Sequence, residues 1–205
     1  MAVFNLGSKV KIFIVVAFLN IGLIFAGAFI YFKFKGNNKM SSNKLSEAYT
    51  SFARGDIRNG FTIIDEVIAR FPKTLAVYQA RLIKADILIE MHRYEEALRI
   101  LEEVLNNGKP KIIKPLASSR IIYLYDSKKD YSKAILASSR FIKKYPDHFL
   151  TKDIYLNLAE YYLISGSKND AIRVFNEVAI KFSNTREAEK ARNRLNNINK
   201  LHRKG

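Results

Sequence analysis

Hydrophobic and polar positions repeat with a fixed period through the last three quarters of the chain. The same pattern occurs in four stretches: GDIRNGFTIIDEVIARFP, HRYEEALRILEEVLNNGK, KDYSKAILASSRFIKKYP and GSKNDAIRVFNEVAIKFS. They begin at Gly55, His92, Lys129 and Gly166, so the intervals are 92 − 55 = 129 − 92 = 166 − 129 = 37 residues. Equal intervals of this length indicate a protein built from stacked structural repeats.

Each stretch predicts one amphipathic helix. Apolar residues follow a small residue at offsets of one, four, seven and eight, which places them on one helical face. The small residue lets a second helix approach closely. Pro72 and Pro146 end the first and third stretches because proline stops a helix, and Asn106-Asn107-Gly108 ends the second by turn formation. The small-residue column consists of Gly60, Ala97, Ala134 and Ala171.

A second predicted helix precedes each of these helices. In the fourth unit it contains Tyr155, Leu158, Ala159 and Tyr162. This string resembles the aromatic-x-x-Leu-Gly-x-x-Tyr signature of tetratricopeptide repeats, and Ala171 and Phe175 complete the pattern. The first unit departs most from the signature, because it has Gly60 in the small column and no such string.

The resemblance implies an all-α fold, a right-handed superhelix of about four helix pairs with a capping helix, in which each pair buries its apolar face against its neighbours. We expect the repeat domain to span residues 45–197. A basic tail of residues 198–205 follows it. The expected repeats are about 39–75, 76–112, 113–149 and 150–186, with the cap at 187–197.

The start of the chain predicts a membrane anchor. After a short basic tail (1–11), residues 12–32 form an apolar run whose only plainly polar side chain is Asn20. As a helix of 21 residues it would be about 31 Å long, which matches a bilayer core. A cleavable signal peptide is the alternative, but the apolar run is too long for one. Residues 33–44, which are small and polar, predict a flexible linker.

The net charge of the chain is +16, and residues 45–205 carry +10 of it, from 29 cations and 19 acids. Such a surface would suit an anionic membrane, an acidic partner or nucleic acid. However, the cations are dispersed over the sequence, so we favour a solvated surface over a nucleic-acid site.

Lysines are slightly more numerous after the apolar run than before it, which by itself places the repeats in the cytoplasm.

The sequence offers no catalytic motif. It has no Cys, which excludes disulfides, thiolate metal sites and lipoprotein acylation. Its three histidines, His92, His148 and His202, show no metal-ligand spacing. We therefore expect no enzymatic activity, no cofactor and no metal.

Repeats of this class bind ligands on the concave face lined by each first helix, which the resemblance places here as a peptide-binding groove. The lysine- and asparagine-based clamp for acidic chaperone tails is absent, with Leu45, Leu82, Ser119 and Leu156 at the corresponding positions. Acidic and aromatic residues would favour extended peptides with apolar and basic side chains. The candidate groove residues are Tyr49, Phe52, Gln79, Asp86, Ile89, Tyr123, Asp126, Glu160 and Leu163.

The layout of anchor, linker and compact repeat domain resembles the bacterial YfgM-type family, most closely through TLAVYQARLIKADILIEMHRYEEALRILEEVL, and the second half is also similar to BamD- and CpoB-type repeat proteins. The resemblance implies a single-pass protein of the inner membrane with periplasmic repeats. It also implies an ancillary role at the Sec translocon, in contact with chaperones or exported substrates. We follow this layout over the small lysine bias.

Two further functions stay open. One is a cytosol-facing, membrane-anchored receptor for peptides, and the other is the binding of an acidic partner through the basic domain surface. The sequence names neither the partner nor the oligomeric state.

Overall fold

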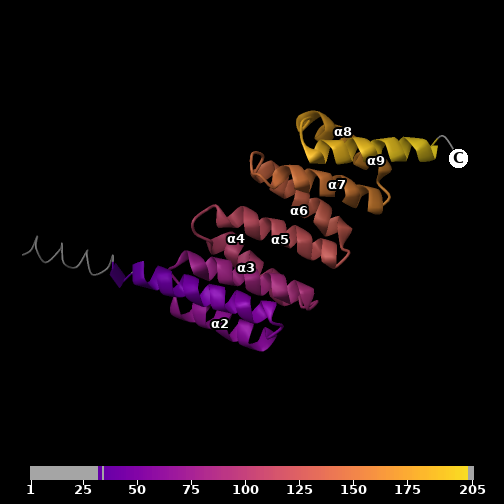
Figure 1. Cartoon of the computed structure of the whole chain (residues 1–205). Helices are drawn as coiled ribbons and strands as arrows, with labels where there is room; N and C mark the ends of the chain where they lie inside the picture. Colours follow the sequence, from indigo (N-terminus) through magenta and orange to yellow (C-terminus); the bar gives the residue numbers. More distant parts are fainter. Residues whose placement is uncertain (1–31, 34, 203–205) are drawn as a thin grey trace, which may run out of the picture. The chain divides into compact units, whose positions relative to one another are not determined.

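The computed structural model describes residues 32–33 and 35–202, which form helices joined by short turns without any strand (Figure 1). This confirms the expected all-α, tetratricopeptide-type fold for that part of the chain. The chain divides into two compact units, Met1–Val77 and Tyr78–Gly205.

Among its described residues, the first unit contains one antiparallel helix pair. Residues 35–53 form the first helix, and α2 (Ile57–Arg70) follows it. Lys44 Nζ lies 3.1 Å from Glu66 Oε2, while Asn59 Nδ2 donates to Ser51 Oγ over 2.9 Å, so the start of one helix meets the end of the other. The buried apolar side chains of this pair include Leu45, Ala48, Ile63, Ile64 and Val67.

Gly60 shows why the first repeat departs from the small-residue column. The ring of Phe52 lies so close to Gly60 that an added Cβ would overlap it. Phe52 also meets Phe61 edge-on, with ring centroids 5.7 Å apart. In this repeat a phenylalanine occupies the space that an alanine side chain would need, so glycine replaces alanine to let the ring approach.

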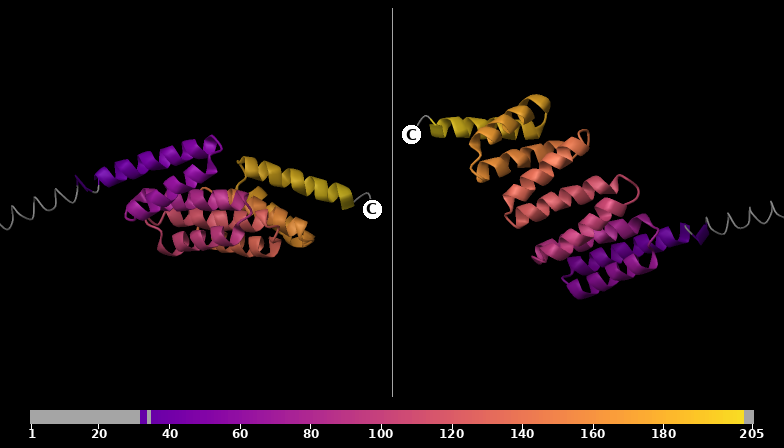
Figure 2. Two further views of the ribbon diagram at one scale, coloured as in Figure 1. Left: turned by 90° about the horizontal axis from the view of Figure 1, so that it is seen from below. Right: turned by 180° about the vertical axis from the view of Figure 1, so that it is seen from behind.

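The second unit is a stack of helices in which, from α4 to α9, each helix packs against the next one in the chain, and α7 also contacts α9 (Figure 2). Each helix therefore gains its buried surface from near neighbours, as expected for a repeat protein. Helix α3 begins before the division between the units. The helices are α3 (Leu75–Glu90), α4 (Tyr94–Asn107), α5 (Ile113–Ser127), α6 (Tyr131–Lys144), α7 (Thr151–Ile164), α8 (Lys168–Lys181) and α9 (Arg186–His202).

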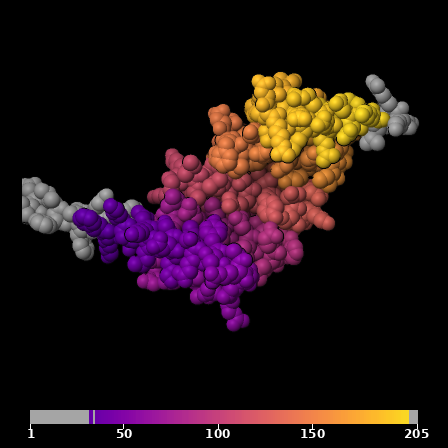
Figure 3. Space-filling view, in the orientation of Figure 1, coloured from indigo at the N-terminus to yellow at the C-terminus, as the bar shows by residue number. Residues whose placement is uncertain are grey.

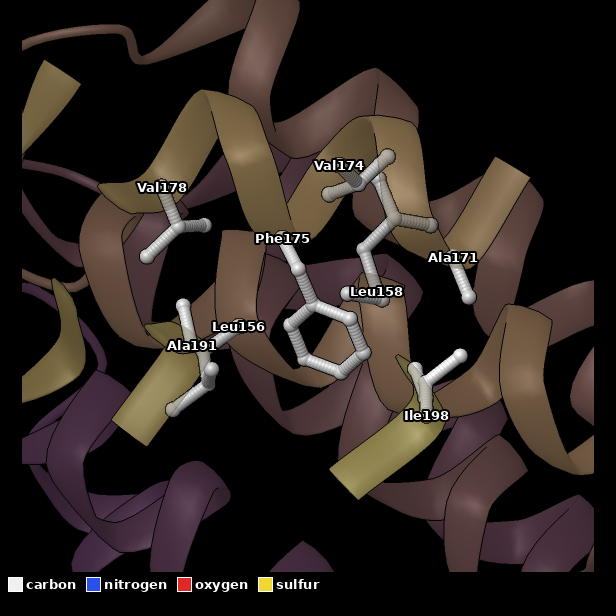
Figure 4. Close-up of a cluster of buried hydrophobic side chains, with 9 residues drawn as sticks. Leu156, Leu158, Ala171, Val174, Phe175, Val178, Ala191 and Ile198 are labelled. Carbon is white, nitrogen blue, oxygen red and sulfur yellow. The ribbon is translucent and has the colours of Figure 1, made fainter. Parts of the chain in front are cut away.

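The C-terminal core joins α7, α8 and α9. Phe175 of α8 is fully buried and lies between side chains of α7 and α9 (Figure 4). Ala171 and Ala191 are also fully buried, and their small side chains allow the three helices to approach closely. The expected small-residue column therefore lies in the core in this unit, where Ala97, Ala134 and Ala171 all have 0% exposure.

The same turn joins the two helices of every repeat. Its central residue has a positive φ: 80° at Gly55, 59° at His92, 57° at Lys129 and 84° at Gly166. The N–H of the following residue donates to the carbonyl five positions earlier, as in Asp130 to Tyr125 over 2.9 Å and Ser167 to Tyr162 over 2.8 Å. This is the Schellman arrangement, which ends one helix and aims the chain into the next.

The helices differ from two of the expected boundaries. Residues 35–44 of the expected 33–44 linker are helical. Ser41 within them is buried, and its hydroxyl donates to the carbonyl of Asn38 over 3.0 Å. Small polar composition therefore did not prevent a helix. The expected tail 198–205 starts too early, since α9 continues to His202 and Ile198 is only 6% exposed.

The expected anchor at residues 12–32 lies almost entirely outside the described residues. Among the helices that the structure describes, none is both long enough and apolar enough to span a bilayer.

The positive φ of Lys129 predicts a stabilising substitution. Side chains other than glycine disfavour this backbone region by about 1 kcal/mol. Lys129→Gly should therefore raise the free energy of unfolding by up to about 1 kcal/mol, while Gly166→Ala should lower it by about the same amount. Urea unfolding followed by circular dichroism measures both. Lower stability of Lys129→Gly would show that its side-chain contacts outweigh the backbone strain.

Candidate protein-binding surface

Polar side chains line one surface of the second unit, where α5, α7 and α9 run side by side. Figure 3 views the second unit from the side on which α9 lies, shown in yellow. These helices come first in their repeats or, for α9, cap the last one, so equivalent positions are 37 residues apart. We refer to this surface as the odd-helix face.

Ion pairs between successive odd-numbered helices cross this face. Arg120 of α5 donates from Nε to both carboxylate oxygens of Asp86 on α3, over 2.8 and 2.9 Å. Arg194 of α9 donates from Nε to Glu160 Oε1 on α7 over 2.7 Å. The two pairs are equivalent positions two repeats apart, because 160 − 86 = 194 − 120 = 74 = 2 × 37.

The intermediate repeat makes a different connection. Tyr123 occupies the position of Asp86 and Glu160, and its hydroxyl donates to Glu90 Oε1 over 2.8 Å. This bond holds the hydroxyl proton, so the Glu90 carboxylate raises the pKa of Tyr123. All three connections are partly exposed to water, and each contributes only about 0.2–1 kcal/mol to stability.

A pocket of about 690 Å³ opens on the odd-helix face between α5, α7 and α9. Its walls combine the acids Asp126 and Glu160 with the cations Lys190 and Arg194. Three asparagines, Asn157, Asn193 and Asn197, are exposed in it, and Leu156 and Ile164 add apolar surface.

Tyr161 forms a buried wall of this pocket. Its side chain is only 4% exposed, and burial, together with the nearby negative charge of Asp126, raises the pKa of its hydroxyl above the ordinary value of 10.0. The hydroxyl therefore stays protonated at neutral pH. The Tyr131 ring lies beside it, tilted by 31°, at a centroid distance of 6.0 Å.

The structure separates the candidate groove residues into two sets. The side chains of the first set are exposed or half-buried. They are Tyr49, Gln79, Asp86, Tyr123 and Glu160. The second set occupies the last turn of each first helix, three residues before the positive-φ position. Its members are Phe52, Ile89, Asp126 and Leu163.

Most of the second set contributes to packing. Ile89 is 1% exposed, so its side chain is not accessible to a ligand. Phe52 packs on Gly60, and Leu163 packs against the C-terminal core. Asp126 is the member that reaches the pocket.

The pocket is not the acidic groove that the sequence suggested. Arg120 and Arg194 neutralise Asp86 and Glu160, and the pocket carries two acids and two cations. Sequence reasoning missed these arginines and the asparagines. The 37-residue repeat contained a sign of these ion pairs, because in two alternate repeats an acid is followed 34 residues later by an arginine.

The described histidines lie away from this pocket. His92 is in the turn before α4, with Nδ1 2.8 Å from the Tyr94 hydroxyl, and His148 packs against Phe149 at a centroid distance of 4.4 Å. Within the described part of the chain, no group of three or more His, Asp or Glu side chains is placed to hold a metal ion.

Comparison with known proteins supports a repeat architecture. Residues 7–150 match the profile of a family described as "Tetratricopeptide repeat-like domain". No curated protein matches the chain.

Three solved structures show the same fold. The nearly identical TPR-like repeats of a protein described as a kinesin light chain from Podosopora anserina align with a TM-score of 0.60, at 15% identity, over 78% of this chain and 84% of that one. MamA from residue 41 onward, from Desulfovibrio magneticus RS-1, aligns with a TM-score of 0.54, at 18% identity, over 74% and 76%. A tetratricopeptide repeat protein from Parabacteroides merdae ATCC 43184 aligns with a TM-score of 0.59, at 14% identity, over 75% and 58%.

The Asp86–Arg120 pair predicts a measurable titration. Burial of the carboxylate raises the pKa of Asp86 above its ordinary 3.8, although Arg120 acts to lower it. Arg120→Met should raise this pKa further, because the opposing cation is removed. The contribution of Asp86 to stability is full below pH 3.8 and is lost as the pH rises through the raised folded-state pKa. Carboxyl NMR titration measures the shift. Arg194→Met is the control and should leave Asp86 unchanged, while a lower pKa in Arg120→Met would contradict the assignment.

Proposed function

The chain belongs to the tetratricopeptide repeat-like domain family, and we propose that it is a membrane-tethered scaffold that binds other proteins through the pocket on its odd-helix face. The fold supports the general part of this proposal, because stacked helix repeats offer extended surfaces suited to protein binding. The proposal assigns no catalytic step to the chain.

The side chains that line the pocket are the reason for assigning protein binding to this surface. The amide of each asparagine both donates and accepts a hydrogen bond, which is what the backbone of an extended peptide requires. Asn157, Asn193 and Asn197 offer three such amides in a space of about 690 Å³. Ile164, which is 57% exposed, offers contact area to an apolar side chain.

The balanced charge of the pocket indicates what kind of partner segment it would bind. With two acids and two cations in its walls, it has little net field to select a strongly charged segment. The partner segment is therefore extended and largely neutral, with apolar side chains, and a basic side chain is favoured only beside Asp126.

The tether rests on the apolar run at residues 12–32. The matched family region begins at residue 7 and so includes that run. Tethering confines the pocket to the membrane surface and raises its effective concentration near membrane-embedded partners.

The resemblance to the YfgM-type layout extends the proposal to a location and a process. The repeats face the periplasm from the inner membrane, where they assist the Sec translocon or envelope protein biogenesis. Chaperones and exported substrates are then the partners. A cytosol-facing receptor for peptides is the alternative, and the lysines that follow the apolar run favour it.

In-cell photo-crosslinking tests the binding surface. A photoreactive amino acid at Asn157, inside the pocket, should give covalent adducts at least several-fold more abundant than the same residue at Asn176, which is exposed on α8 outside the pocket. Adducts that contain a translocon subunit or an exported chain would support the finer assignment. Equal adduct yields at the two positions would contradict this use of the pocket.

Cysteine accessibility tests the orientation. The chain has no Cys, so Lys204→Cys introduces a unique thiol. We expect a membrane-impermeant thiol reagent to label it in cells whose outer barrier has been opened. Labelling only after lysis would place the repeats in the cytoplasm and favour the peptide-receptor alternative.

A further inference from the structure

A second pocket, of about 440 Å³, lies between α4, α5 and α6. Its floor is apolar, formed by Leu105, Ile121 and Ala137. On the α6 side it is bordered by the exposed residues Leu136, which is 50% exposed, and Arg140, together with Lys133 and Lys144. Glu102 of α4 also lines the pocket.

The repeat frame shows that Arg140 is an exception. Its counterparts at intervals of 37 residues are Glu66, Glu103 and Glu177. Each of these acids has a partner: Lys44 at 3.1 Å from Glu66, Arg81 at 2.9 Å from Glu103 and Arg173 at 3.1 Å from Glu177. In the third repeat the charge is reversed.

Arg140 also lacks an ion-pair partner among the residues that the structure describes. In the first two repeats the acid at this position pairs with Lys44 or Arg81. The third repeat has Ser118 at the position of these cations and Arg140 at the position of the acid, so it cannot form this pair. The Arg140 guanidinium thus lines the pocket without an ion pair to any described carboxylate, Glu102 included, and its five N–H donors remain for a ligand.

Leu136 is a second departure in the same place. Its counterparts are Thr62, Arg99 and Arg173. Arg173 bonds to both Asp170 and Glu177, which gives the equivalent surface of α8 its own closed charge network. On α6 an exposed leucine replaces that arginine.

All the charged residues of α6 are cationic. It carries Lys133, Arg140, Lys143 and Lys144 and no acid. Lys133 is paired with Asp130 at 3.1 Å, which leaves the far end of the helix, around Arg140 and Lys144, as the cationic edge of the pocket.

We propose that the pocket between α4, α5 and α6 is a second protein-docking site, which takes an amphipathic segment of a partner protein with acidic residues along one edge of its apolar face. The apolar side chains enter the floor beside Leu136. The acidic edge lies along α6, where Arg140 binds a carboxylate through paired N–H groups. Glu102 repels an acid on the opposite side, so it sets the orientation of the segment.

A binding assay with a designed probe tests this site. The probe is a fluorescein-labelled 18-residue helical peptide with leucines on one face, glutamates beside them and alanines elsewhere. The full chain is held in zwitterionic nanodiscs, and empty nanodiscs are the blank. Fluorescence anisotropy gives the dissociation constant. The same peptide with Lys in place of Glu serves as the charge-reversed probe.

The repeat frame supplies the variants. Arg140→Glu restores the acid of the other repeats, and Leu136→Thr introduces the residue of the first repeat, which removes the apolar contact without adding charge. Each should weaken binding of the acidic probe at least tenfold, because one removes the carboxylate partner and the other the apolar contact. Lys143→Glu makes the same charge change on exposed surface of α6 outside the pocket, and should weaken binding less than threefold.

Two further controls separate this site from others. Asn157→Lys alters the odd-helix pocket and should leave the acidic probe's affinity unchanged, so failure of the second site and failure of the proposed function are distinguishable. Binding of the acidic probe should also weaken as NaCl rises from 50 to 500 mM.

Three results would overturn the proposal. The first is unchanged affinity in both Arg140→Glu and Leu136→Thr. The second is an equal loss in Lys143→Glu, which would reduce the effect to the general charge of α6. The third is binding of vesicles rich in phosphatidylglycerol, or of single-stranded DNA, that Arg140→Glu abolishes while the peptide probe fails to bind, which would assign the cations to a lipid surface or a nucleic acid.

Discussion

The turn inside each repeat is the constraint on which the register of the structure depends. One residue at positive φ and one hydrogen bond across five positions end the first helix and start the second in the same way each time. Because His92 and Lys129 adopt this conformation without being glycine, the turn is imposed by the packing of the helices that it joins. The constant turn keeps equivalent residues 37 positions apart, and everything on the surface inherits that spacing.

The core and the surface use this spacing differently. Core positions are repeated nearly unchanged, as the fully buried Ala97, Ala134 and Ala171 show, because a larger side chain would separate the helices. Surface positions vary, since partly exposed ion pairs contribute little to stability. A carboxylate can therefore become Arg140 in one repeat at little cost to the fold. Differences between repeats at such positions carry the functional information.

The fold could be predicted well from the sequence because the features that indicate it lie within short stretches of the chain. The period, the small column and the turn residues each follow from short stretches. The ends of the domain were harder, because residues 35–44 are mostly small and polar, which is typical of a linker, yet they are helical and Ser41 among them is buried. The site was predicted only in part. Ile89 lies one turn from an exposed position, yet it is buried, and helical periodicity alone could not separate the two. The neutralisation of Asp86 by Arg120 needed the stacking of successive repeats.

The two pockets of the second unit differ in chemistry in a way that suits one scaffold with two partners. The odd-helix pocket balances its charges and offers Asn157 and its neighbours as amide groups, so salt should affect it little. The pocket beside α6 has a cationic edge around Arg140, so salt should weaken it strongly. The pockets share α5 but no lining residue: one lies between α5, α7 and α9, and the other between α4, α5 and α6. A neutral extended segment and an acidic amphipathic one would thus not compete for the same walls, which is the property a scaffold needs to hold both at once.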